Sequence, residues 1–192
     1  MATNAKTVHR LKVTLRQVRP PVWRRIEVPS DMRLSELAGV LEAAMGWMGG
    51  HLHAFDADGV LYEIPDEEGF GRRTTRDERK AQLGQALRDV RARMRWDYDF
   101  GDGWEHDVVV EAIEPRAGDV RYPRCLAGRR ACPPDDCGGP WGYNELLAAL
   151  ADPLHVEHQS LTVWAPSGFD PEAFDVEVAT EMMRSARPLQ GW

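Results

Sequence analysis

Alternating apolar and polar residues indicate a β-hairpin near the middle of the chain. From Met94 to Phe100, and again from Trp104 to Ala112, every second residue carries an apolar, aromatic or imidazole side chain. This period of two is typical of a strand with one buried face. The intervening Gly101-Asp102-Gly103 segment predicts the turn.

Two turns fit this hairpin. A two-residue Asp102-Gly103 turn would pair Phe100 with Glu105 and put the two apolar stripes on opposite faces. A three-residue loop with Gly103 in the left-handed conformation pairs Phe100 with Trp104 and puts both stripes on one face. The apolar pattern favours the three-residue loop.

That register would crowd four carboxylates on the other face of the hairpin. Asp99 would face Glu105 and Asp97 would face Asp107, and like charges opposite each other destabilise a strand pair. Two interpretations follow. The face is either solvated and contacted by arginines, or it is a functional acidic site for a cation or a basic partner.

The same pattern predicts the remaining elements. Strands are expected at 11–15, 22–28, 51–55 and 60–64, and helices at 34–45, 83–90, 143–150 and 170–184. Gly46 fits a helix C-terminal cap, and Asp170-Pro171-Glu172 a helix start that buries Phe174, Val178 and Met182. Arg24 interrupts an inward stripe, so its strand lies at an edge or carries a bulge.

The predicted fold class is α+β. We expect a mixed, mainly antiparallel sheet with a β-grasp-like hairpin–helix–hairpin start and C-terminal helices packed on it. The 192 residues suit one domain, spanning 1–192. Within it, 65–80 is a charged loop expected to be mobile, 119–143 an ordered but irregular Pro/Gly/Cys loop, and 143–185 a helical C-terminal part.

Composition and charge restrict the function classes. No apolar run is long enough to span a membrane, and three cysteines without a secretory signal indicate a reducing cytoplasm. The net charge is −7; nine basic and three acidic residues make Arg72–Arg95 +6, which leaves −13 elsewhere. Nucleic acid could therefore dock only through Arg72–Arg95, and neutralisation of the protein's own acidic face is favoured.

Two clusters could bind a metal. Cys125, Cys132 and Cys137 have C-x6-C-x4-C spacing, which could hold zinc, although buried free thiols are favoured. His51 and His53 could supply two ligands or an acid–base pair, but the wet side of an edge strand is favoured. We expect no cofactor, with zinc or another divalent cation as the lesser alternative.

Two passages carry a family resemblance, YDFGDGWEH at Tyr98–His106 and CLAGRRACPPDDCGGPWGY at Cys125–Tyr143. With them the chain resembles the plasmid pRiA4b ORF-3-like family across 8–185, and PPVWRRIEVP, AMGWMGGHLHAF and FDPEAFD also fit. The resemblance implies a bacterial or archaeal α+β domain, associated with mobile elements and mostly uncharacterised. It implies a shared pocket at six positions but no mechanism: Asp99, Asp102, Trp104, His106, Asp136 and Gly138.

The favoured function is an accessory binding domain with no assignable activity. The 125–143 loop would fold beside the hairpin tip and form an acidic, aromatic-lined cleft for a cation, a basic peptide or a partner protein. One alternative is a metal-dependent hydrolase or nuclease that uses Asp99, Asp102, His106 and Asp136. Another is a mobile-element-associated protein that binds DNA through 72–95.

Overall fold

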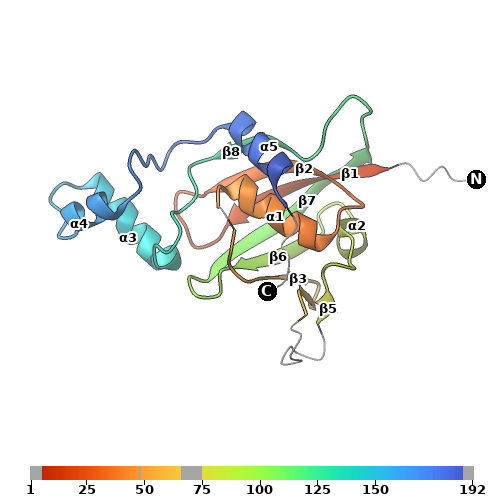
Figure 1. Ribbon diagram of the computed structural model, residues 1–192, viewed down its shortest axis with the longest axis horizontal. Coiled ribbons are helices and arrows are strands. Elements are labelled where there is room, and N and C mark those ends of the chain that lie inside the picture. Colours follow the sequence, from red (N-terminus) through yellow and green to blue (C-terminus); the bar gives the residue numbers. More distant parts are fainter. Residues whose placement is uncertain (1–5, 48, 66–74, 188–192) are drawn as a thin grey trace, which may run out of the picture.

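The computed structural model describes residues 6–47, 49–65 and 75–187. They form one mixed, mainly antiparallel sheet with helices, so the α+β prediction is confirmed (Figure 1). The strands are β1 Thr7–Leu15, β2 Trp23–Pro29, β3 His53–Ala57, β4 Val60–Glu63, β5 Arg76–Asp77, β6 Arg93–Tyr98, β7 Trp104–Pro115 and β8 Arg124–Arg129. The helices are α1 Leu34–Met45, α2 Leu83–Ala86, α3 Gly139–Ala151, α4 His158–Trp164 and α5 Val176–Ser185.

The sheet is built around the predicted hairpin. Its strand order is β5-β4-β3-β6-β7-β1-β2-β8, and only β4 and β5 run parallel. The chain starts with hairpin β1–β2, helix α1 and hairpin β3–β4, and α1 lies across one face of the sheet (Figure 1). α5 packs against α1 and β8, whereas α3 and α4 pack on each other to one side. None of the helices in the described ranges is long and apolar enough to cross a membrane.

A buried arginine joins β2 to the end of α1. Arg24 is 1% exposed, and its guanidinium donates to the carbonyl oxygens of Ala44 at 2.8 Å and Met45 at 3.2 Å. These carbonyls belong to the last helical turn, where no further amide follows to satisfy them. β2 lies between β1 and β8, so the edge-strand alternative is wrong. The bulge is present, at the register shift with β8 between Arg25 and Ile26.

The central hairpin keeps its predicted faces but not its predicted register. Tyr98 pairs with Trp104, and Trp96 with His106, so the three-residue loop is wrong. The shift is two residues, which leaves both aromatic stripes on the buried face. Phe100 instead leaves the sheet and is 55% exposed. Asp99 also lies outside the strand, with a left-handed φ of 53°. Gly103 is left-handed as predicted, at φ 69°.

The shift removes most of the predicted carboxylate crowding on the strands. Asp97 now faces Glu105, whereas Asp107 faces Arg95. Arg95 pairs with Asp97 at 2.9 Å. Arg16 pairs with Glu105 at 2.7 Å and approaches Asp107 at 3.9 Å. The strand part of the acidic face is therefore contacted by arginines.

Other segments differ from the expectation at their boundaries. β8 lies within 119–143, which had no strand-like alternation to predict it. The last helix begins at Val176 rather than at 170, because the Asp175 carboxylate accepts from Glu177 N and Val178 N. Phe174 therefore precedes the helix, and Val178 is 57% exposed.

The charged segment and the short second helix also differ. Residues 66–74 of the segment predicted as mobile lie outside the described residues. The part that follows them contains β5 and the fully buried Glu78. The predicted 83–90 helix is one turn long, with Leu83 and Leu87 buried and Val90 50% exposed.

Candidate functional site

The tip of the β6–β7 hairpin holds the carboxylate of Asp99 in a fixed orientation. Asp99 Oδ1 accepts from the backbone amides of Gly101 at 3.0 Å and Asp102 at 3.3 Å, and the amide of Gly103 donates to the Asp99 carbonyl. These bonds hold Asp99 in the left-handed region, where a non-glycine residue needs such compensation. They also leave Oδ2 facing outward from the turn, on a side chain that is 13% exposed.

His51 approaches Asp99 from the connection between α1 and β3. Gly49 and Gly50 have φ 81° and 106°, so the chain bends sharply before the histidine. The Nδ1 atom of His51 lies 3.4 Å from Asp99 Oδ2, longer than a good hydrogen bond. The imidazole edge also meets the Tyr98 ring, with centroids 5.6 Å apart.

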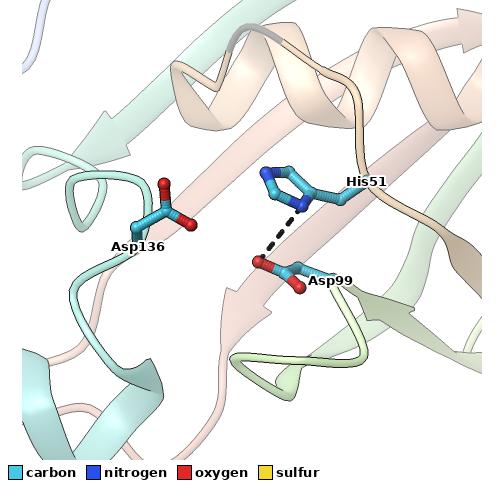
Figure 2. Close-up of side chains that lie close together, drawn as sticks. All are labelled: His51, Asp99 and Asp136. Atoms are coloured by element: carbon cyan, nitrogen blue, oxygen red, sulfur yellow. Dashed lines mark ion pairs between the residues drawn. The ribbon is translucent and has the colours of Figure 1, made fainter.

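Asp136 comes from the loop before α3, which rests on the hairpin tip. A Cβ on Gly139 would lie 2.1 Å from the Asp102 carbonyl oxygen, so glycine is required for this close approach. Asp136 itself is left-handed at φ 58°. Donor atoms of His51, Asp99 and Asp136 all lie within 4.8 Å of one another (Figure 2). In the described part of the chain this is the one such group of three possible metal ligands.

Trp47 links the segments that carry this group to the aromatic core. Its indole Nε1 donates to the Pro133 carbonyl at 3.1 Å, which ties the end of α1 to the loop that carries Asp136. Its ring stacks on Tyr98 at 4.7 Å and meets Trp104 and His106 at 5.9 Å and 5.4 Å. The donor-bearing loops therefore rest on a rigid aromatic core.

Several buried polar atoms next to this group have no hydrogen-bond partner among the described residues. They include Tyr98 Oη, Glu42 Oε1 and Asp102 Oδ2. Tyr98 is 1% exposed, and its pKa is raised by burial and then by the carboxylates of Glu42, Asp135 and Asp99. Such atoms cost free energy unless water, an ion or a ligand satisfies them.

Carboxylates also dominate the electrostatics of the site. Burial raises the pKa of Glu42 to about 7, although the nearby His53 and His51 act in the opposite direction. Burial likewise raises the pKa of Asp135, opposed by His51 and reinforced by Asp136, Asp99 and Asp102. An added cation would therefore relieve both repulsion and desolvation.

The six positions from the family resemblance fall into two places. Asp99 and Asp136 contribute donors to the group in Figure 2. Asp102 lies beside Gly139, and Gly138 is the left-handed N-cap of α3 at φ 84°. Trp104 and His106 are instead core residues, 1% and 0% exposed. Burial lowers the pKa of His106 to about 3, so this imidazole is neutral and sealed from solvent.

Sequence reasoning placed the two nearby histidines incorrectly. His53 is 6% exposed on the interior strand β3, not on the wet side of an edge. Its Nε2 lies 2.9 Å from the buried Glu78 carboxylate. His51 precedes the strand and turns toward Asp99. The glycine pair before it was a signal that the chain leaves strand geometry there.

The cysteines contribute no donor atom to the His51–Asp99–Asp136 group. All three are free, and the Cys125 Sγ contacts the carbonyls of Arg25 at 3.6 Å and Ala127 at 3.5 Å. Burial, followed by the carboxylate of Asp102, raises the pKa of Cys137 to about 12. Among the described residues, no three potential ligands that lie this close together include a cysteine.

Part of the basic strip is engaged with the protein's own acids. Asp77 pairs with Arg79 at 2.9 Å and Lys80 at 3.5 Å, and Arg95 pairs with Asp97. Residues 72 and 73 lie outside the described residues.

A cleft of about 700 Å³ adjoins the site. It runs between the end of α1, the loop that precedes α3, and α5 with the segment before it. Asp136 belongs both to this cleft and to the group in Figure 2. The aromatic side chains that line the cleft are Trp47, Trp164, Phe169 and Phe174.

Comparisons with known proteins place the chain in a family. The model of the plasmid pRiA4b ORF-3-like proteins matches residues 7–178. The chain is 46% identical over 163 residues to the uncharacterized protein y4hQ of Sinorhizobium fredii, covering 84% of this chain and 82% of that one. It is also similar to the crystal structure of the protein of unknown function MM3350 from Methanosarcina mazei. The TM-score is 0.80 at 36% identity, covering 90% of this chain and 97% of that one. The chain therefore belongs to the plasmid pRiA4b ORF-3-like family.

Proposed function

We propose that this protein is a binding domain for a divalent transition-metal cation, held by His51 Nδ1, Asp99 Oδ2 and a carboxylate oxygen of Asp136. The observation that carries the proposal is the convergence of these donors from three segments that are distant in sequence (Figure 2). Two ligands about 2.1 Å from a tetrahedral ion lie about 3.4 Å apart. The His51–Asp99 separation of 3.4 Å fits that spacing better than it fits a hydrogen bond.

The donor set also indicates which metals would bind. Two carboxylates alone would suit Mg²⁺ or Ca²⁺, whereas an imidazole nitrogen favours first-row transition metals. For one site of mixed nitrogen and oxygen donors, Zn²⁺ should bind more tightly than Mn²⁺. The amides of Gly101 and Asp102 support the proposal, because they orient Asp99 as outer partners orient ligands in metal sites.

The test is a titration of chelator-treated full-length protein with Zn²⁺, Mn²⁺ and Mg²⁺ by isothermal calorimetry, with elemental analysis after gel filtration. We expect one equivalent of Zn²⁺, weaker Mn²⁺ binding and no Mg²⁺ binding. Asp99→Asn keeps the amide-accepting oxygen but loses the charge, and His51→Gln removes the imidazole. Each should weaken Zn²⁺ binding by at least about tenfold.

Asp119→Asn is the matched control, because Asp119 is exposed and lies outside both the cleft and the donor group. It should bind Zn²⁺ as the wild type does. Absence of stoichiometric metal in the wild-type protein, or an equal loss in the control, would contradict the proposal.

A second candidate ligand is a basic peptide. It is favoured by the crowding of carboxylates around Asp135. Burial and the carboxylates of Asp136, Asp99 and Asp102 raise the pKa of Asp135, and only His51 acts against them. A tri-arginine peptide that binds the metal-free protein and is displaced by Zn²⁺ would support a shared acidic site. Binding that is insensitive to both Zn²⁺ and Asp136→Asn would contradict this candidate.

A further inference from the structure

The cleft beside the candidate metal site has apolar walls that no other part of the described chain covers. Trp164 is 46% exposed and Val178 is 57% exposed, and both line it. The walls come from the end of α4, the segment between α4 and α5, and α5, whereas His51 and Asp99 come from the α1–β3 connection and the hairpin tip. Asp136 is the residue that the two features share.

Two of the four charged side chains that line the cleft already make hydrogen bonds within the protein. Arg24 lies in its floor, but its guanidinium donates to four carbonyl oxygens, including those of Ala44 and Met45. Asp175 uses one carboxylate oxygen to cap α5. The polar end of the cleft is therefore formed by Asp135 and Asp136, at the candidate metal site.

Three protein ligands leave at least one coordination position open on a zinc ion. Because Asp136 belongs to both features, a ligand that fills the open position from the cleft has aromatic and aliphatic walls beside it. A cleft of about 700 Å³ is within the range of sites for small organic molecules. Flat apolar groups gain most from aromatic walls such as Trp164 and Phe169.

We infer that the ligand of this protein is a small organic molecule with an aromatic or similarly flat apolar group and an oxygen donor that coordinates the bound metal. The apolar group lies between Trp164 and Val178, and the oxygen donor faces Asp136. This inference rests on the metal site proposed above.

The probes are benzohydroxamate and acetohydroxamate, which share the same chelating group and differ in the phenyl ring. Full-length protein is loaded with Zn²⁺, freed of excess metal and titrated with each compound while its tryptophan fluorescence is followed. Benzohydroxamate should bind at least tenfold more tightly than acetohydroxamate. Neither compound should bind the metal-free protein at the same concentrations.

Two substitutions in the wall test where the phenyl group binds. Trp164→Ala should abolish the preference for benzohydroxamate without changing Zn²⁺ affinity or acetohydroxamate binding. Val178→Glu, at a second exposed wall position, should do the same. Trp141→Ala is the matched control, because Trp141 is 80% exposed on α3 and does not line the cleft. It should keep the preference.

The outcomes separate this inference from the metal site itself. If Zn²⁺ is retained but the two hydroxamates bind equally, or the preference survives both wall substitutions, the inference about the cleft is overturned and the metal site stands. If Zn²⁺ is not retained, the metal site fails and this inference fails with it.

Discussion

Arg24 and the His51–Asp99–Asp136 group are two charged regions that meet the same cleft, through Arg24 and Asp136, and they differ in how their polar atoms are satisfied. Arg24 is buried, and its guanidinium donates to the carbonyls of Trp23, Ala44, Met45 and Arg129. Around the group in Figure 2, in contrast, buried oxygens of Tyr98, Glu42 and Asp102 have no partner among the described residues.

Charges that stabilise the fold can thus be distinguished from charges that are arranged to bind a ligand by whether their polar atoms have partners within the protein. A buried charge whose three nitrogen atoms all donate hydrogen bonds within the protein serves the native fold and has little left to offer a ligand. A set of carboxylates that repel one another costs free energy in the isolated protein. The first region should therefore respond to substitution through stability, and the second through binding.

The largest expected effect is on stability at Arg24. Arg24→Met would leave the carbonyls of Ala44 and Met45 buried and unpaired, and should lower the free energy of unfolding by roughly 3–5 kcal/mol. Urea unfolding measures this. Its neighbour Arg25 is half-buried and pairs with Glu111 at 2.8 Å, so Arg25→Met should cost less than about 1 kcal/mol. Equal losses of unfolding free energy in the two variants would show that the buried hydrogen bonds of Arg24 contribute no more than the half-buried ion pair of Arg25.

The next effect is a change in the free energy of unfolding on substitution of Asp99, and its sign depends on whether metal is bound. Without metal, Asp99→Asn relieves repulsion and should raise the free energy of unfolding by roughly 0.5–1 kcal/mol. With Zn²⁺ at a hundred times its dissociation constant, the wild-type protein should gain about 2.7 kcal/mol and the variant far less. Thermal or urea unfolding with and without Zn²⁺ tests this. A variant that is less stable than wild type in both conditions would show that Asp99 serves the fold alone.

A smaller effect tests whether His106 is a neutral residue of the core. The folded protein keeps His106 neutral, with a pKa of about 3, whereas the unfolded chain takes up its proton near pH 6.5. This contribution to stability is complete above pH 6.5 and is lost as the pH falls toward 3. Between pH 7.5 and 5.0 the wild type should lose about 2 kcal/mol more than His106→Gln. Parallel pH profiles for the two proteins would mean that His106 takes up its proton with the same pKa in the folded protein as in the unfolded chain.

The smallest effect concerns a carboxylate that already has a partner. Asp97 lies on the same hairpin as Asp99, but it pairs with Arg95 at 2.9 Å. Asp97→Asn should change the free energy of unfolding by less than about 0.5 kcal/mol and leave Zn²⁺ affinity unchanged. A loss of Zn²⁺ binding as large as that in Asp99→Asn would mean that general acidity, not the donor group, binds the metal.

The regular elements were predictable because their patterns are local. The spacing of apolar residues fixed α1, and Gly46 terminates it at φ 111°. The hairpin faces followed from alternation, but the register did not, because the side chain of Asp99 builds its own turn with Gly101 and Asp102. β8 has no alternating pattern, and it forms because β2 offers it a partner.

The site was predictable only in part. Asp99 and Asp136 were named from motifs, but nothing local brings His51 to them. Its position depends on the bend at Gly49–Gly50 and on the packing of the α3 loop against the hairpin tip, which are both tertiary features. His106 was named from the same motif as Asp99, yet the strand period places it in the core. Arg24 broke the apolar pattern because its partners are carbonyls at the end of α1, from another part of the chain.

The most direct measurement of the central claim is anomalous diffraction at the zinc edge from crystals of the full-length protein grown with Zn²⁺. We expect one strong peak between His51 Nδ1, Asp99 Oδ2 and Asp136, at about 2.0–2.2 Å from each donor atom. A peak held by the cysteines, or no peak at the hairpin tip at saturating Zn²⁺, would contradict it.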